Sequence, residues 1–218
     1  MSIQKATVYV VEDDAEVRES LTLVIRGMGL NVEAYASAES FLDGYCDCPD
    51  VPKCMVLDIR MPGLSGLGLH QMLTAEGRGM PTIMMSGCAD ISTAVRAMSA
   101  GALDFLEKPV NLQTLLARIR EAIDCYVRQQ RHTSHKTELA RQMEKLSARQ
   151  REVLDLLMVG ERSKQIARQL GIGEKTVAKH RATVLEKMQV DNVVELVRLF
   201  TDTDVCGTVG HTAVASCH

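Results

Sequence analysis

Five short apolar runs alternate with five amphipathic stretches in the first half of the chain, and this alternation constrains the fold more than any other feature. The first run, residues 6–11, is continuous and rich in β-branched side chains, as expected of a strand covered on both faces. Residues 15–28 follow with a helical spacing of apolar side chains, and Gly29 ends the predicted helix. Four more strand and helix pairs are predicted at residues 31–35 and 38–45, 54–57 and 67–73, 82–85 and 91–100, and 103–106 and 112–127. Five such units predict an α/β fold with a five-stranded, parallel, doubly wound sheet.

The second half of the chain is predicted to be helical, and a polar gap precedes it. Residues 128–138 contain no large apolar side chain, which indicates either a solvated helix continuing the fifth helix or a flexible tether. Ser147 with Gln150 forms a capping box for the next helix, and further helices are predicted at residues 163–170, 174–188 and 192–200. The predicted organisation is a first domain at 1–125, a linker at 126–143, an all-α four-helix domain at 144–201 and a disordered tail at 202–218.

Composition limits the location and the partners of the chain. No run approaches the roughly 18 apolar residues of a membrane span, and residues 1–7 lack the pattern of an export signal. We therefore predict a cytoplasmic protein with no membrane partner, and we interpret its seven cysteines as free thiols. Residues 1–124 carry 10 Lys and Arg against 17 Asp and Glu, whereas the remainder carries 15 against 11. This asymmetry indicates that only the second half binds a polyanion.

Polar residues follow the predicted strands where a parallel sheet would bring them together. Glu12, Asp13 and Asp14 follow the first strand, Asp58 ends the third, Ser86 ends the fourth and Lys108 ends the fifth; all strand ends of this kind share one edge. Clustered carboxylates repel one another, and a hard cation such as Mg²⁺ relieves that repulsion. A carboxylate can also act as a nucleophile in phosphoryl transfer while a lysine neutralises the transferred oxygens. We predict a magnesium site here, with Asp58 as the nucleophile.

Four motifs resemble the receiver domains of two-component response regulators over about residues 5–125. They are VVEDD from Val10, LDIRMPGLSG from Leu57, MMSG from Met84 and GALDFLEKP from Gly101. The resemblance implies that Asp58 accepts phosphate from a histidine kinase. It also implies that Asp13, Asp58 and the backbone carbonyl of Arg60 hold Mg²⁺. Glu12, which stands where the family more often has Asp, would assist through water.

The same resemblance assigns roles to the ends of the fourth and fifth strands. Lys108 would contact the phosphate, and the Lys108–Pro109 peptide would be cis. Ser86 and Phe105 would form a switch pair, in which the hydroxyl moves to the phosphate and the ring turns inward. That movement would favour dimerisation through a face formed by the fourth helix, the fifth strand and the fifth helix. Phe105 replaces the more common tyrosine, so its ring lacks a hydroxyl.

Other interpretations fit the residues of the first half less well. Asp14 is a candidate helix-start residue that complements the helix dipole. Haloacid-dehalogenase phosphatases also form an aspartyl phosphate, but they carry a second Asp two residues after the nucleophile, where this chain has Arg60. A flavodoxin-like cofactor binder would share the fold, yet no phosphate-binding loop follows Val11. We therefore expect a phospho-acceptor that at most catalyses its own phosphorylation and dephosphorylation, rather than an enzyme.

The predicted helical domain carries a concentrated positive charge. Residues 162–187 contain seven Lys and Arg against two acids, and the cationic side of the helix at 174–188 lies opposite its apolar stripe. LSARQREVL from Leu146, SKQIARQLGI from Ser163 and EKTVAKHRATVLEKM from Glu174 resemble the LuxR/FixJ/NarL-type helix-turn-helix over about residues 144–200. By that resemblance the third helix enters the major groove. The DNA-binding candidates are Lys164, Lys175, Thr176, Ala178, Lys179, His180, Arg181, Ala182 and Lys187.

The whole chain resembles response regulators of the FixJ type. This resemblance implies a sensor histidine kinase, promoter DNA and RNA polymerase as partners, and a homodimer that forms on activation and activates transcription. Two alternatives stay open. The output domain would bind RNA or protein instead of DNA, or DNA binding would be controlled without phosphate, by oxidation of Cys88 or by constitutive dimerisation.

Overall fold

The computed structural model describes residues 6–48, 51–87 and 91–204, and these form two compact units, Met1–Gln129 and Gln130–His218. Each unit is considered separately. No helix among the described residues is long and apolar enough to span a lipid bilayer. The cysteines within the described ranges, Cys46, Cys48, Cys54 and Cys125, are all free. Cys88, and residues 205–218 of the predicted tail, lie outside the described residues.

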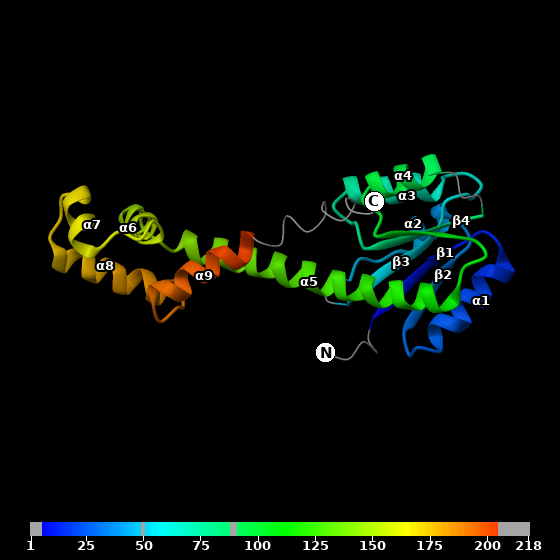
Figure 1. Ribbon diagram of the computed structural model, residues 1–218, viewed down its shortest axis with the longest axis horizontal. Coiled ribbons are helices and arrows are strands. Elements are labelled where there is room, and N and C mark those ends of the chain that lie inside the picture. The colour runs from blue at the N-terminus through cyan, green and yellow to red at the C-terminus, as the bar shows by residue number, and fades with distance from the viewer. Residues whose placement is uncertain (1–5, 49–50, 88–90, 205–218) are drawn as a thin grey trace, which may run out of the picture. The chain divides into compact units, whose positions relative to one another are not determined.

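The first unit is built on a five-stranded parallel sheet with the order β2-β1-β3-β4-β5, which confirms the predicted α/β fold (Figure 1). The strands are β1 (Thr7–Val11), β2 (Asn31–Tyr35), β3 (Lys53–Asp58), β4 (Thr82–Ser86) and β5 (Asp104–Glu107). The helices that follow them are α1 (Ala15–Arg26), α2 (Ala38–Gly44), α3 (Gly66–Ala75), α4 (Ile91–Ser99) and α5 (Leu112–Glu144). Every predicted strand and helix of this half is present, with shifts of one or two residues at most ends, but α5 continues 17 residues beyond its predicted end at residue 127.

Two hydrophobic layers cover the two faces of the sheet. On one face, Leu21 and Ile25 of α1 pack with Leu115 and Ile119 of α5 against alternate residues of the central strands. On the other face, helices α2, α3 and α4 supply the cover, as Phe41 and Leu69 illustrate. Strands β1, β3 and β4 are buried along their whole length because both of their faces are covered.

The loop after β3 makes an unusually close approach to the end of that strand. A Cβ atom added to Gly66 would lie 2.0 Å from the backbone oxygen of Asp58, a distance that no side chain tolerates. The amide of Gly66 donates to the carbonyl of Ile59 at 3.1 Å, which holds the first turn of α3 beside the strand end. Glycine is therefore required at position 66 for steric reasons rather than for backbone flexibility.

The second unit contains four helices after α5, as predicted: α6 (Ala148–Met158), α7 (Ser163–Leu170), α8 (Glu174–Lys187) and α9 (Val193–Asp204). The predicted capping box is present, with the Ser147 side chain accepting from the Gln150 amide and the Gln150 side chain accepting from the Ser147 amide. Gly171 ends α7 in the left-handed conformation that glycine favours. Helix α9 continues to Asp204, beyond its predicted end at residue 200, so residues 202–204 of the predicted disordered tail are helical.

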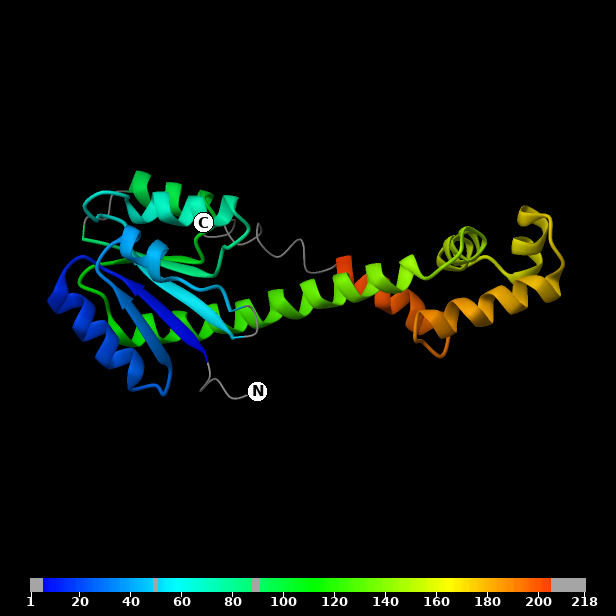
Figure 2. The same ribbon diagram turned by 180° about the vertical axis from the view of Figure 1, so that it is seen from behind.

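The predicted linker forms part of one helix, α5, and its two ends contribute to hydrophobic cores. Tyr126 is buried in the first unit, and Leu139 is buried in the second with Met143 packed beside it. Figures 1 and 2 show α9 alongside the C-terminal turns of α5, and Leu196 belongs to the same cluster as Leu139. The last turns of α5 are therefore structural elements of the second unit, and the exact domain boundaries stay a prediction.

Replacement of Gly66 by alanine tests the close approach at the end of β3. Because the added methyl group would overlap the Asp58 carbonyl, we expect Gly66→Ala to lower the free energy of unfolding of the first unit by about 3 kcal/mol. Urea denaturation measures the change. Gly79→Ala is the matched control, since a Cβ there meets its nearest atom at an ordinary 3.5 Å. Equal stability of the two variants would contradict the steric requirement.

Truncation of Leu139 tests whether α5 belongs to the core of the second unit. We expect Leu139→Ala to destabilise helices α6 to α9 by about 2 kcal/mol, because it removes a buried side chain from their cluster. Hydrogen exchange of the backbone amides in α6 to α9 measures this loss directly. Thr137→Ala, on the exposed surface of the same helix, should change protection little. Unchanged protection in the Leu139 variant would show that the unit is stable without α5.

Candidate functional site

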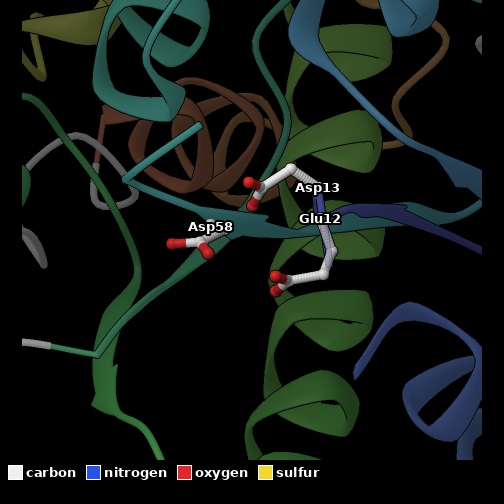
Figure 3. Close-up of side chains that lie close together, drawn as sticks. All are labelled: Glu12, Asp13 and Asp58. Carbon is white, nitrogen blue, oxygen red and sulfur yellow. The ribbon is translucent and has the colours of Figure 1, made fainter. Parts of the chain in front are cut away.

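The carboxyl edge of the sheet brings together the acidic and basic residues predicted from the sequence. Glu12 and Asp13 directly follow β1, Asp58 is the last residue of β3, and Lys108 follows β5. Strands β1 and β3 are neighbours in the sheet, so the three carboxylates face one another across a short gap (Figure 3). One carboxylate oxygen from each of Glu12, Asp13 and Asp58 lies within 4.8 Å of the others.

Lys108 forms ion pairs with two of these carboxylates. Its Nζ donates to Asp58 Oδ2 at 2.5 Å and to Glu12 Oε2 at 2.6 Å. Burial acts to lower the pKa of Lys108, but its hydrogen bonds with Asp58 and Glu12 outweigh that effect and raise the pKa. The ammonium group therefore stays protonated and supplies a fixed positive charge beside Asp58. The backbone of Lys108 is held by its amide, which donates to the Ser86 carbonyl at 2.8 Å.

Glu12 is the most deeply buried acid of the site. Its residue is fully buried, and its Oε1 atom has no hydrogen-bond partner within the described part of the chain. Burial raises the pKa of Glu12, and the neighbouring Asp58 raises it further against the opposing effect of Lys108. A buried carboxylate oxygen without a partner is costly, and a cation or a cation-bound water would satisfy it. The three carboxylates thus fit a divalent metal ion.

The Asp58 carboxylate is held in a fixed orientation. Its Oδ1 atom accepts from the Arg60 amide at 3.0 Å, while Oδ2 accepts from Lys108. Its side chain is 7% exposed, so the carboxylate meets solvent only at this edge of the sheet. A carboxylate fixed at both oxygens beside a permanent cation is suited to attack an electrophile whose oxygens carry negative charge.

Asp14 and Arg18 organise the loop that carries the acidic pair. The Asp14 side chain accepts from the amides of Glu16 and Val17, so it caps helix α1 and lies outside the metal-binding group. Arg18 Nη1 donates to the carbonyl of Glu12 at 2.7 Å and to that of Asp13 at 3.1 Å. The sequence analysis missed Arg18 because its partners are backbone atoms of preceding residues, and no motif names them.

The two candidate switch residues lie on neighbouring strands, Ser86 at the end of β4 and Phe105 at the second position of β5. Ser86 is fully buried at the end of β4, and Phe105 in β5 is half-buried. The Phe105 ring packs against a cluster that joins β3 and β4 to α3 and α4 and includes Ile59 and Met84. The Lys108–Pro109 peptide is cis, as expected. Inward movement of this ring would require that cluster to repack.

Helix α8 separates its core-facing residues from its cationic residues. Val177 and Val184 are fully buried. The exposed candidates on α7 and α8 are Lys164, Lys175, Thr176, Ala178, Lys179, Arg181 and Ala182, and His180 is half-buried. A hollow of about 740 Å³ beside α7 is lined by Arg162, Lys164, Arg168, Gly160, Gln165 and Gln169, with no acid among these residues.

Lys187, another candidate DNA contact, forms hydrogen bonds within the second unit. Its Nζ atom donates to the backbone carbonyl of Lys145 at 2.8 Å and to Gln150 Oε1 at 2.9 Å. The last turn of α8 packs beside the junction of α5 and α6, so the nearest acceptors for this ammonium lie within the unit itself. Lys187 therefore links α8 to α6 and to the turn between α5 and α6.

Two family models match the chain. The response regulator receiver domain matches residues 8–120, and the model of bacterial regulatory proteins of the luxR family matches residues 144–200. The chain is 39% identical to the response regulator protein TmoT of Ectopseudomonas mendocina, with 91% of this chain and 90% of the relative covered. It is 41% identical to the transcriptional regulatory protein FixJ of Azorhizobium caulinodans, with 88% and 90% covered.

Solved structures give the same result. The response regulator StyR matches with a TM-score of 0.78 and 38% identity, covering 91% of this chain and 99% of that chain. Full-length FixJ from B. japonicum matches with a TM-score of 0.55 and 36% identity, covering 92% and 98%. The chain therefore belongs to the two-component response regulators, with a receiver domain followed by a LuxR-type helix-turn-helix DNA-binding domain.

Proposed function

We propose that Asp58 accepts a phosphoryl group from a sensor histidine kinase and that this event controls DNA binding by the second domain. The observation that carries the proposal is the placement of Lys108 Nζ within hydrogen-bonding distance of Asp58 and Glu12. An Asp58 oxygen forms the new bond to phosphorus, and the bond from phosphorus to the imidazole nitrogen of the kinase breaks. Lys108 stabilises the charge on the transferred oxygens. The product is an acyl phosphate on the protein, which is a phospho-acceptor rather than a turnover enzyme.

Mg²⁺ is the cofactor that the acidic group fits. Asp13, Asp58 and the backbone carbonyl of Arg60 would hold it directly, with Glu12 assisting through water. The Oε1 atom of Glu12, which has no hydrogen-bond partner among the described residues, supports this assignment because it leaves a buried acceptor unsatisfied in this group. When bound, Mg²⁺ neutralises negative charge on the phosphoryl oxygens. Arg18 holds the Glu12 and Asp13 carbonyls, and so the backbone segment from which both carboxylates extend.

The phosphoryl group would act on the rest of the receiver through Ser86 and Phe105. The Ser86 hydroxyl would move to the phosphate and the Phe105 ring would turn inward, which would alter the surface of α4 and β5. That surface carries Ile91, Val95 and Met98, three exposed apolar residues that recur along one side of α4. Such a stripe supports dimerisation of two activated receivers through this face.

The second domain would bind promoter DNA in the cytoplasm as a dimer and activate transcription through contact with RNA polymerase. Helix α8 would enter the major groove, where Lys179 is placed to donate to a base edge and Ala178 and Ala182 to contact thymine methyl groups. The remaining candidates, Lys164, Lys175, Thr176, His180 and Arg181, would contact the backbone. The cationic hollow beside α7, which Lys164 helps to line, supports phosphate binding by this motif.

Phosphorylation of Asp58 is tested with acetyl phosphate and Mg²⁺ as a small-molecule donor. We expect wild type to become phosphorylated and Asp58→Asn to remain unmodified, as measured by phosphate-affinity gel electrophoresis and intact mass. Asp14→Asn is the matched control, because asparagine preserves the cap of α1 while an acid is still lost. Modification of Asp58→Asn to the wild-type level would place the acceptor elsewhere.

The positioning role of Arg18 is tested by direct metal binding. Loss of its two hydrogen bonds frees the carbonyls of Glu12 and Asp13, so we expect Arg18→Gln to weaken Mn²⁺ binding about tenfold, equivalent to about 1.4 kcal/mol. Electron paramagnetic resonance of Mn²⁺, a substitute for Mg²⁺, measures the dissociation constant. Arg26→Gln, at the far end of α1, controls for the lost charge. Identical affinities in the two variants would rule out positioning by Arg18.

A further inference from the structure

One side of the middle of α5 carries a row of basic residues that the proposed function does not use. The row consists of Arg128, Arg131, His132, His135 and Lys136, and we call it the basic stripe. Their spacing of three and four residues places all five on the same side of the helix. Four of them are exposed and His132 is half-buried.

The Arg and Lys residues of the stripe differ from two other cations on α5, which form ion pairs with acids. Arg118 pairs with Glu121 and Asp104, and Arg141 pairs with Glu138. Among the described residues, Arg128, Arg131 and Lys136 form no ion pair. Arg128 and Arg131 are like charges three residues apart, and such a pair destabilises a helix. An anion bound to this side of the helix would therefore stabilise it.

A second copy of the same helix does not suit this surface. Residues 128–138 contain no large apolar side chain that would form the seam of a coiled coil. Two basic stripes facing each other would also repel. The ligand that suits this positively charged surface is a polyanion.

Contacts at the C-terminal end of α5 connect the stripe to the DNA-binding helices. Lys187 of α8 donates to the carbonyl of Lys145, and Gln142 Nε2 of α5 lies 3.3 Å from Gln189 Oε1. Leu139, three residues after Lys136, is buried in the core of the second unit. Lys136, the last residue of the stripe, lies nine residues before Lys145, which the end of α8 contacts. Along a helix this separation corresponds to about 13 Å.

We propose that the basic stripe binds the phosphate backbone of duplex DNA outside the bases contacted by α8. This proposal rests on the proposed DNA binding and extends its footprint. The stripe is about 12 Å long, and one DNA strand presents a phosphate every ~3.4 Å along the axis, so the three Arg and Lys residues match a run of three or four phosphates. The acidic receiver is a weaker competitor, because its net charge of −7 is spread over 124 residues.

The test compares two full-length double variants with equal loss of charge. Arg131→Gln/Lys136→Gln removes two cations of the stripe within the second unit, and Arg26→Gln/Arg120→Gln removes two exposed cations of the first. Glutamine has a helix propensity similar to that of Lys and Arg. The probe is a 40-base-pair duplex of mixed sequence, and its affinity is measured by fluorescence anisotropy from ~50 to ~200 mM KCl.

We expect the stripe variant to bind this duplex about tenfold more weakly than the control variant at the higher salt concentration. The slope of log affinity against log salt should fall by about 1.8 per protomer, because each lost phosphate contact removes ~0.9. Equal affinities and equal slopes for the two variants would overturn the proposal. Tighter binding by the stripe variant would also overturn it, and would indicate that the stripe binds the acidic receiver instead.

The same experiment distinguishes failure of DNA binding by α7 and α8 from failure of the stripe proposal. If wild type shows no salt-dependent binding to any duplex, then DNA binding by α7 and α8 fails, and the stripe proposal is overturned with it. If wild type binds duplex DNA and only the difference between the variants is missing, DNA binding stands and the stripe proposal alone is rejected.

Discussion

The two ion pairs of Lys108 are the interaction on which the rest of the receiver site depends. This lysine follows β5, yet it binds a carboxylate at the end of β3 and another after β1, so it spans most of the carboxyl edge of the sheet. Its side chain is 20% exposed, and its two partners are almost completely buried. Removing one partner of such a group leaves an uncompensated buried charge, which is strongly unfavourable. The same cation therefore stabilises the acidic cluster before phosphorylation and is already in place to bind a phosphoryl group.

Much of this site was predictable from the sequence because the sheet is parallel. Once five strand and helix pairs were identified, Glu12, Asp58 and Lys108 had to share one edge, although nearly 100 residues separate the first from the last. The supporting contacts were not predictable in this way. Arg18 binds backbone carbonyls, and Gly66 is required by a steric overlap with Asp58, so neither residue shows a chemical pattern that a sequence reveals.

In the second domain too, features set by local sequence signals were predictable, and features set by contacts between helices were not. Its capping box and the limits of α7 followed from helix signals, because these depend on residues three or four positions apart. The contribution of α5 to the core of the second unit could not be predicted from the sequence, because residues 128–138 are polar and Leu139 is a single apolar residue after them. Lys187, a predicted DNA contact, also binds acceptors at Lys145 and Gln150, which lie 42 and 37 residues away in the sequence. The burial of Leu139 and the hydrogen bonds of Lys187 both depend on contacts between segments far apart in the sequence.

The central claim is that phosphorylation of Asp58 controls DNA binding. It is tested most directly by the affinity for a duplex selected from a random pool, measured together with oligomeric mass, with and without beryllofluoride and Mg²⁺. The account predicts that this phosphoryl analogue tightens DNA binding and increases the dimer fraction in wild type, and that it changes neither in Asp58→Asn. Equal DNA binding by wild type with and without the analogue would contradict phosphate control, and would favour constitutive dimerisation or oxidation of Cys88 as the regulatory event.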